Sequence, residues 1–363
     1  MRAMRDVLMV SKPIAPPWTD SNKNLVRDLA TALRRYRPWV MVPRGAALPG
    51  VVSVPVYREA GAYAPSRAAN ARVFQQLLLG PTVDLWHFFF APNPLTLRAG
   101  AVARAIRGVR SIHTIASAPD GLETVAPLLF ADTVVALSEH TARRLAHVGV
   151  HAEVIPPAQA PLTVSDDAIA AARARHGIVG DYVLYPGDVE HSDGARVFVD
   201  AASAGGALTW VIAARPKTDR ARHAVAALKT RAAERNAKVL FLGEIDDIHA
   251  VVAGAAMTAL VVDTLHAKMD LPLVLLESLA LRVPVLVSTS TAAAELLPSG
   301  GALGLPAGDA SSLAAAVTAL HGDPARRAAL GAAGAAWVAA RCAPDVVAAA
   351  YERVYDRVLA RRR

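Results

Sequence analysis

Short runs of apolar, β-branched residues recur along the whole chain, and each is followed by a polar loop and then by a helical pattern. In the clearest example, an apolar run at 259–262 leads through a Pro-containing loop into an apolar helix at 273–281, and a second run follows at 284–287. A run that is apolar at every position is typical of a parallel strand that is buried on both faces. Strands that alternate with helices in this way build an open α/β sheet.

The alternation begins near residue 7 and restarts near residue 182, and 363 residues exceed the usual size of one hydrophobic core. We therefore expect two doubly wound, Rossmann-like domains, at 1–163 and 164–340. A C-terminal helix at 341–363 is expected to pack back on the first domain. Because open sheets bind ligands outside the carboxyl ends of their strands, the ligand site is predicted in a cleft between the two domains.

Composition excludes several classes of protein. The chain has one cysteine, Cys342, so it has neither an internal disulfide nor a cysteine-based metal cluster. It contains no uninterrupted apolar stretch of about 18 residues, and its N-terminus lacks the apolar core and cleavage site of a signal peptide. We expect a cytoplasmic protein without a transmembrane helix.

The net charge of +8 comes mainly from the first half of the chain. Such a field suits an anionic membrane surface, a phosphorylated ligand or nucleic acid, and a general solubility charge is the alternative. The few aromatic residues and the lack of a recognition motif argue against nucleic acid. We expect peripheral contact with the inner face of a membrane. The arginines concerned are Arg34, Arg35 and Arg37, and then Arg98, Arg104, Arg107 and Arg110.

Three polar residues follow the first strand, at 7–10. Ser21, Asn22 and Lys23 offer hydroxyl, amide and ammonium donors beside the start of a helix, where anions bind well. They predict a seat for an oxyanion or a phosphate. The alternative is that Asp20 or Ser21 only caps the helix, and both can hold.

Two further residues of the first half lie at strand ends. His87 is near the carboxyl end of the strand at 84–90, where it is either a catalytic group or a hydrogen-bonded core histidine. Ser138 follows the strand at 133–137, and we expect it to cap the next helix.

The second half places glycines and charged residues at strand ends. Gly187 and Gly194 frame a loop in which a ligand can approach the backbone closely. Lys268 and Asp270 lie in the loop of the 259–287 unit, and Glu277 lies in its helix among leucines, so it is not on a fully wet face. Other polar or glycine positions at strand ends are Asp188, Glu190, Arg215 and Gly243.

Several motifs in this order resemble the family-4, glycogen-synthase-like glycosyltransferases of the two-Rossmann-domain (GT-B) type. The residues 273–280 followed by Val283-Pro284-Val285 resemble that family's donor-site helix and next strand. The residues 239–243 and 305–309 resemble the strand before that unit and the tail after it. The resemblance implies an enzyme of polysaccharide biosynthesis that moves a sugar, with retention of configuration, from a nucleotide-diphosphate donor to a glycan, lipid-linked or small-molecule acceptor.

The resemblance also implies roles for individual residues. Glu277 would bind the donor ribose, Lys268 would neutralise the diphosphate, Asp270 would orient sugar hydroxyls and His87 would reach toward the sugar. No tightly bound cofactor is implied, and no metal site is assigned. The implied donor-binding residues are Gly187, Asp188, Glu190, Arg215, Gly243, Leu273 and Val274, and the implied acceptor-binding residues are Ser21, Asn22, Lys23 and Ser138.

The chain departs from the family pattern at the donor site. Met269 stands where the family has a second glutamate, and Asp188 and Asp193 stand where it has the arginine and lysine that hold the diphosphate. Lys268, Arg215 or Lys217 could supply the missing positive charge. The alternatives are a divalent metal on the two aspartates, a different donor, or a different role. Two other functions therefore stay open: a catalytically degenerate binding or scaffold protein in a polysaccharide pathway, and an epimerase of the same fold.

Overall fold

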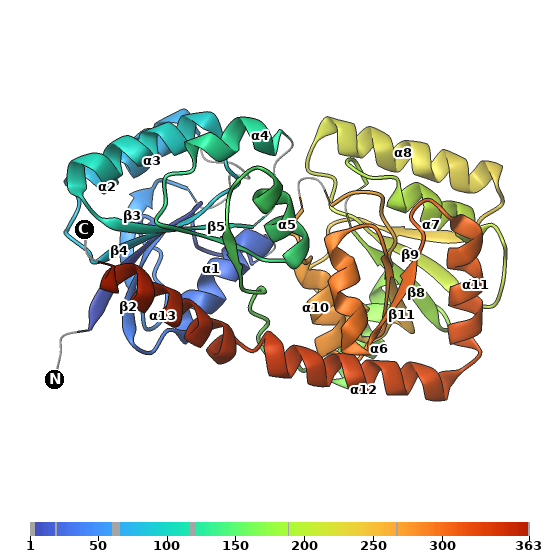
Figure 1. Ribbon diagram of the computed structural model, residues 1–363. Helices are drawn as coiled ribbons and strands as arrows, with labels where there is room; N and C mark the ends of the chain where they lie inside the picture. The colour runs from blue at the N-terminus through green and yellow to red at the C-terminus, as the bar shows by residue number, and fades with distance from the viewer. Residues whose placement is uncertain are drawn as a thin grey trace. The chain divides into compact units, whose positions relative to one another are not determined.

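The computed structural model describes residues 4–18, 20–59, 66–116, 121–187, 189–265 and 268–361. The chain divides into two compact units: unit 1 is Met1–Ala160 with Arg341–Arg363, and unit 2 is Pro161–Ala340. Each unit is built on a parallel sheet with helices on both faces (Figure 1). The predicted fold class, α/β with two Rossmann-like domains, is confirmed.

Unit 1 contains a seven-stranded sheet in the order β3-β2-β1-β4-β5-β6-β7, all of it parallel within the described residues. Its strands are β1 (Arg5–Val10), β2 (Tyr36–Pro43), β3 (Val52–Tyr57), β4 (Leu85–Phe89), β5 (Arg110–Ile115), β6 (Thr133–Ala136) and β7 (Ala152–Val154). Its helices are α1 (Ser21–Ala32), α2 (Arg67–Leu79), α3 (Pro94–Arg107), α4 (Leu122–Val125), the 3₁₀ turn η1 (Ala126–Leu128), α5 (Glu139–His147) and α13 (Pro344–Ala360).

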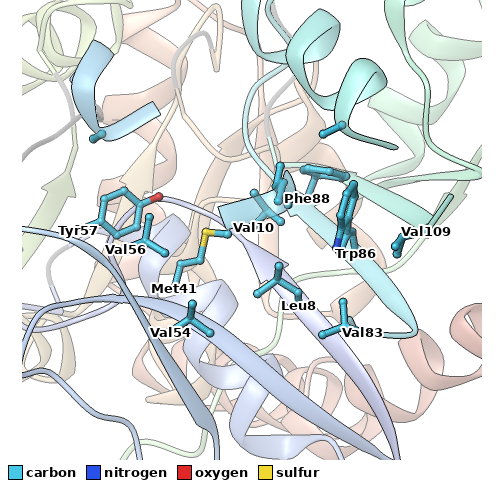
Figure 2. Close-up of a cluster of buried hydrophobic side chains, with 13 residues drawn as sticks. Leu8, Val10, Met41, Val54, Val56, Tyr57, Val83, Trp86, Phe88 and Val109 are labelled. Atoms are coloured by element: carbon cyan, nitrogen blue, oxygen red, sulfur yellow. The ribbon is translucent and has the colours of Figure 1, made fainter. Parts of the chain in front are cut away.

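Alternation along the central strands decides what packs on each face of this sheet, because successive side chains of a strand point to opposite faces. Leu8 of β1 and Trp86 and Phe88 of β4 join the core cluster in Figure 2, which also includes side chains of α2 and α3. The intervening residue His87 points to the opposite face. There it contacts rings of α13.

Unit 2 contains a six-stranded parallel sheet in the order β10-β9-β8-β11-β12-β13. Its strands are β8 (Tyr182–Pro186), β9 (Thr209–Ala213), β10 (Val239–Leu242), β11 (Met257–Leu260), β12 (Val285–Ser288) and β13 (Ala302–Leu305). Its helices are α6 (Asp166–His176), α7 (Gly194–Ala202), α8 (Asp219–Glu234), α9 (Ile248–Ala253), α10 (Leu273–Ala280), the 3₁₀ helix η2 (Ala292–Ser299), α11 (Ala310–His321) and α12 (Pro324–Arg341).

The last helix, α13, returns to unit 1, where it lies beside α1 and against β5. Its buried carboxylate, Glu352, accepts hydrogen bonds from the backbone N–H groups of Arg34 (2.8 Å) and Arg35 (2.6 Å) and from Nε of Arg35 (2.9 Å). Asp356, one turn later, accepts from Arg35 and from the hydroxyl of Tyr36, each at 2.6 Å. These contacts give hydrogen-bond partners to backbone N–H groups of the turn between α1 and β2.

Two elements differ from the sequence-based expectation. The strand expected at 259–262 is β11, Met257–Leu260, because the ladder to β12 ends at Leu260 while the next two valines stay buried without pairing. Helix α3 was not indicated by an apolar periodicity. Its outward side carries Leu95, Val102 and Ile106, so apolar residues are not confined to the side that packs inward.

Candidate functional site

The topology marks one ligand-binding point in each unit. In unit 2, β8 is flanked by β9 on one side and by β11 on the other, so the strand order reverses there. In unit 1, β1 is flanked in the same way by β2 and β4. Ligands of open α/β sheets bind at such switch points, beyond the carboxyl ends of the two diverging strands.

Gly187 and Lys268 meet at the switch point of unit 2, and Gly194 shares the neighbour Tyr185 with Gly187; we call these three residues the β8–β11 site. A Cβ atom added to Gly187 would lie 3.2 Å from Nζ of Lys268 and 3.0 Å from the ring of Tyr185. A Cβ atom added to Gly194 would lie 2.5 Å from Val262, which is too close for any side chain. The structure therefore brings together Gly187 and Lys268, which were predicted separately, and it explains why both loop positions are glycine.

The start of α7 adds backbone donors to this site. Asp193 occupies the N-cap position without capping the helix through its side chain. Its carboxylate is mostly exposed and pairs with Arg196 at 2.7 Å, while its own N–H donates to Asp263 at 2.9 Å. The first N–H groups of α7 therefore have no side-chain cap, and the positive end of the helix dipole is available to an anion.

Three of the predicted donor-binding residues lie around the ends of β8, β9 and β10. Arg215, after β9, pairs with Glu244 at 3.3 Å. Glu190 accepts a hydrogen bond of 2.7 Å from the hydroxyl of Thr218, which joins the loops that follow β8 and β9. Gly243, after β10, has no atom within 4 Å of the position that a Cβ would take.

Glu277 is in α10, with its side chain 15% exposed, and its carboxylate lies 3.4 Å from Nε2 of His249 in α9. Sequence reasoning missed His249, because no spacing rule relates a residue of α9 to one of α10. The only available signal was a histidine at the start of a short helix that follows a strand end. The imidazole of His249 is therefore a polar neighbour of the Glu277 carboxylate.

The remaining residues of this region are largely buried. Asp270 is 6% exposed, and Leu273 is 4% exposed at the start of α10. Val274 is half-buried and packs against the core of unit 2. No side chain caps α10, whose N-cap residue is Pro272. Asp188 lies outside the described residues.

The loop after β1 forms the corresponding site of unit 1. Asp20 caps α1 by accepting hydrogen bonds from the N–H groups of Asn22 (3.0 Å) and Lys23 (3.2 Å), so the capping alternative holds for Asp20. Lys23 is 5% exposed, and its ammonium group donates to the carbonyl of Ala15 at 3.1 Å, which ties the loop to the helix. Ser21 is exposed, and Oδ1 of Asn22 is buried without a hydrogen-bond partner.

His87 and Ser138 have structural partners. His87 is fully buried, and its ring nitrogens bind the hydroxyls of Tyr355 (2.8 Å) and Thr114 (2.7 Å). Because both nitrogens are occupied beneath α13, His87 is not placed to reach a sugar, and we leave it out of the proposed catalytic group. Ser138 is buried and caps α5 by accepting from the N–H of Thr141 at 3.0 Å.

The buried histidines of unit 1 predict that its free energy of unfolding decreases when the pH is lowered. Burial lowers the pKa of His113 to about 4, and it lowers the pKa of His87 as well. Below pH 6.5 the histidines of the unfolded chain bind protons that the buried native histidines do not bind. Their contribution to the free energy of unfolding is therefore complete above that pH and is lost as pH falls. For His113 alone, the free energy of unfolding should drop by about 2 kcal/mol between pH 7 and pH 5. Hydrogen exchange of β4 and β5 measures this loss.

A variant separates this effect from other titrations. His113→Phe keeps an aromatic ring beside Phe90 and removes the titrating group, so exchange in β5 should depend less on pH than in the unchanged chain. Carboxylates with lowered pKa values, such as Asp132, act mainly below this window. An unchanged pH dependence in the variant would contradict the assignment.

The described residues contain neither a membrane-spanning helix nor a ready-made metal site. No helix among them is both long and apolar enough to span a bilayer. In the same part of the chain, no group of three or more His, Cys, Asp or Glu side chains is arranged to hold a metal ion. The alternative of a metal on Asp188 and Asp193 involves a residue outside that part.

Comparisons with known proteins agree with this architecture. Residues 180–323 match the family model described as glycosyl transferases group 1. No curated protein matches the chain in sequence.

Solved structures of similar fold cover nearly the whole chain. HepE of Anabaena in complex with UDP has a TM-score of 0.78 at 17% identity, covering 97% of this chain and 100% of its own. A glycosyltransferase from Rickettsia africae has a TM-score of 0.78 at 13% identity, covering 99% and 100%. Sucrose-phosphate synthase of Thermosynechococcus elongatus has a TM-score of 0.77 at 17% identity, covering 98% and 99%. Residues 180–323 of unit 2 are therefore similar to the glycosyl transferases group 1 family, and the whole chain shares the two-domain fold of these solved structures.

Proposed function

We propose that the chain transfers a sugar from a nucleoside diphosphate sugar, bound by unit 2, to an acceptor bound by unit 1. The observation that carries this proposal is the β8–β11 site. There the ammonium group of Lys268 lies beside the backbone of Gly187 at the topological switch point, close to the uncapped start of α7 through Gly194. A cation, two glycines and free helix N–H groups suit a diphosphate.

The same groups suit the chemistry of the transfer. When the bond between sugar and diphosphate breaks, negative charge grows on the leaving phosphate oxygen. Lys268 and the N–H groups of α7 are already in position before the bond breaks. They would stabilise the growing charge and so lower the barrier. We assign the ribose hydroxyls to Glu277, the sugar hydroxyls to Asp270, and a retaining course to the reaction.

In this proposal, other residues replace the arginine and lysine that hold the diphosphate in the family. Asp193 neutralises Arg196 and is mostly exposed, so its carboxylate is not held against the phosphates. Lys268 takes over one positive charge, and Arg215 takes over the second when its exposed partner Glu244 gives way to the donor. The motifs over residues 239–309 support membership of family 4.

We propose UDP as the nucleotide, because the structures of HepE contain UDP, UDP with glucose, and UDP-glucose. For the acceptor, we propose a glycan, lipid-linked or small molecule in the cytoplasm, held by Ser21 and Asn22 at the switch point of unit 1. The exposed hydroxyl of Ser21 and the unpartnered amide oxygen of Asn22 are hydrogen-bonding groups for a polar acceptor.

Thermal unfolding with nucleotides tests the donor. UDP at one hundred times its Kd should stabilise the chain by about 2.7 kcal/mol. UMP should give a smaller shift in Tm and uridine none, because the diphosphate makes the contacts at the β8–β11 site. The same scan with GDP and ADP identifies the base. If no nucleoside diphosphate shifts Tm, the donor proposal is wrong.

A turnover assay distinguishes transfer from the degenerate binding protein. Incubation with UDP-glucose and a mixture of lipid and glycan acceptors should release UDP and form a new glycoside. Binding of UDP with neither transfer nor hydrolysis would favour a binding role.

A further inference from the structure

The outward faces of α2 and α3 form an apolar surface on unit 1. Seven large hydrophobic side chains are exposed in the described part of the chain, and four of them lie on these two helices: Leu79 (76%), Leu95 (69%), Ile106 (65%) and Val102 (51%). Their clustering decides the interpretation, because single exposed hydrophobic residues are ordinary whereas a patch marks an interaction surface. We call these four residues the α2–α3 face.

Helix geometry places the α3 members together. Leu95, Val102 and Ile106 are separated by seven and four residues, so they lie on one side of the helix, and Arg98 lies four residues before Val102 on that side. The opposite side of α3 packs inward through Leu97 and Ala103. The two helices lie side by side against one face of the sheet (Figure 1).

The charge of this surface is of one sign. Neither α2 nor α3 contains an aspartate or a glutamate. Arg67 and Arg98 are exposed, and the guanidinium of Arg107 donates to the carbonyls of Leu78 and Gly80 (2.5 and 3.1 Å), so its charge stays beside Leu79.

Four of the seven arginines that suggested membrane contact from sequence are tied to carboxylates. Arg35 and Arg37 pair with Glu352 and Asp6 at 2.9 and 2.6 Å, and Arg104 and Arg110 pair with Asp132 at 2.5 and 2.9 Å. The positive charge that remains without a carboxylate therefore includes the arginines around the α2–α3 face.

We propose that the α2–α3 face docks unit 1 reversibly on an anionic lipid surface. Aliphatic side chains enter the interfacial region while arginines at the rim meet lipid phosphates, which is how interfacial helices bind. Charge argues against a second copy as the occupant. In a two-fold interface this face would meet itself and bring arginines together without a carboxylate between them.

Vesicle flotation of the full chain tests the docking. The protein should float with vesicles of phosphatidylcholine and phosphatidylglycerol at 3:1 and much less with phosphatidylcholine alone. Combining Leu95→Ser, Val102→Ser and Ile106→Ser should reduce the bound fraction at least about tenfold. Arg98→Glu should reduce it by about fivefold or more, because a basic residue near an anionic surface is replaced by an acidic one.

The controls separate the proposal from other outcomes. Val179→Ser removes an equally exposed side chain (79%) of unit 2 and should leave flotation unchanged. Because the substituted side chains are exposed, Tm and the stabilisation by UDP should not change, so a defect in the donor site would be recognised separately. The proposal is overturned if the triple variant floats like the unchanged chain. It is also overturned if sedimentation shows that the triple substitution converts a dimer to a monomer, since a second copy then covers this face.

Discussion

Replacing Lys268 with methionine should lower kcat/KM for the nucleoside diphosphate sugar by about 10²- to 10³-fold. The ammonium group lies beside Gly187, where the leaving phosphate is proposed to gain charge. Methionine keeps most of the length and the apolar stem of lysine, so the loss reports the charge. The measurement is steady-state release of UDP, and binding of UDP should weaken more than binding of UMP.

A matched substitution controls for the general loss of a positive charge. Lys229→Met changes an exposed lysine of α8 whose ammonium lies over the ring of Phe241, and it should leave kcat/KM within about twofold. Lys268→Arg should restore part of the activity, because the charge returns with a different shape. Equal kcat/KM in the Lys268→Met variant and the unchanged chain would remove Lys268 from the mechanism.

Removal of residues 344–363 should unfold unit 1 while unit 2 stays folded. This helix buries Val347, Tyr351, Val354, Tyr355 and Val358, each no more than 2% exposed. At about 1.5–3 kcal/mol for each side chain, their burial contributes on the order of 10 kcal/mol, which is as large as the whole stability of an ordinary domain. Hydrogen exchange with mass spectrometry should show protection lost in β1, β4 and β5 and retained in β8 and β11.

Single substitutions in α13 should destabilise unit 1 by smaller amounts. Tyr355→Phe keeps the ring and removes the hydroxyl that binds His87, which should cost about 1–2 kcal/mol. Glu352→Gln leaves the three donors near Arg35 with a weaker acceptor, at a cost of about 2 kcal/mol. Arg353→Ala, on the exposed side of α13, should change nothing measurable. Retained protection of unit 1 in the truncated chain would show that α13 is dispensable.

The sequence predicted the sheets well because their strands are buried on both faces. The run of β8 is apolar at every position, and that of β12 is apolar until its last residue, Ser288, so the position of each strand and of its carboxyl end is clear from the sequence. Helix α3 escaped notice for the opposite reason. A helix with apolar residues on its outer side as well gives less contrast between its two sides, and the outer side of α3 is the one proposed above to dock on a lipid surface.

The candidate site was predictable in its position and not in its contacts. Strand ends and glycines indicated Gly187 and Lys268, but only the order of β8 and β11 in the sheet shows that they meet. For His87, the position in the sequence did not decide its role. Its place near the end of β4 is equally compatible with a ligand site and with the core, and α13, more than 250 residues later, decides for the core.

The division of the chain has a consequence for its biosynthesis. Unit 2 is one continuous segment, Pro161–Ala340, whereas unit 1 needs residues from both ends of the chain. On the ribosome, the part of unit 1 that is made first therefore keeps its contact surface for Tyr351 and Tyr355 unfilled until α13 has been synthesised. We expect unit 2 to acquire its native structure before unit 1. The N-terminal part of unit 1 is expected to depend on chaperones until α13 has been made.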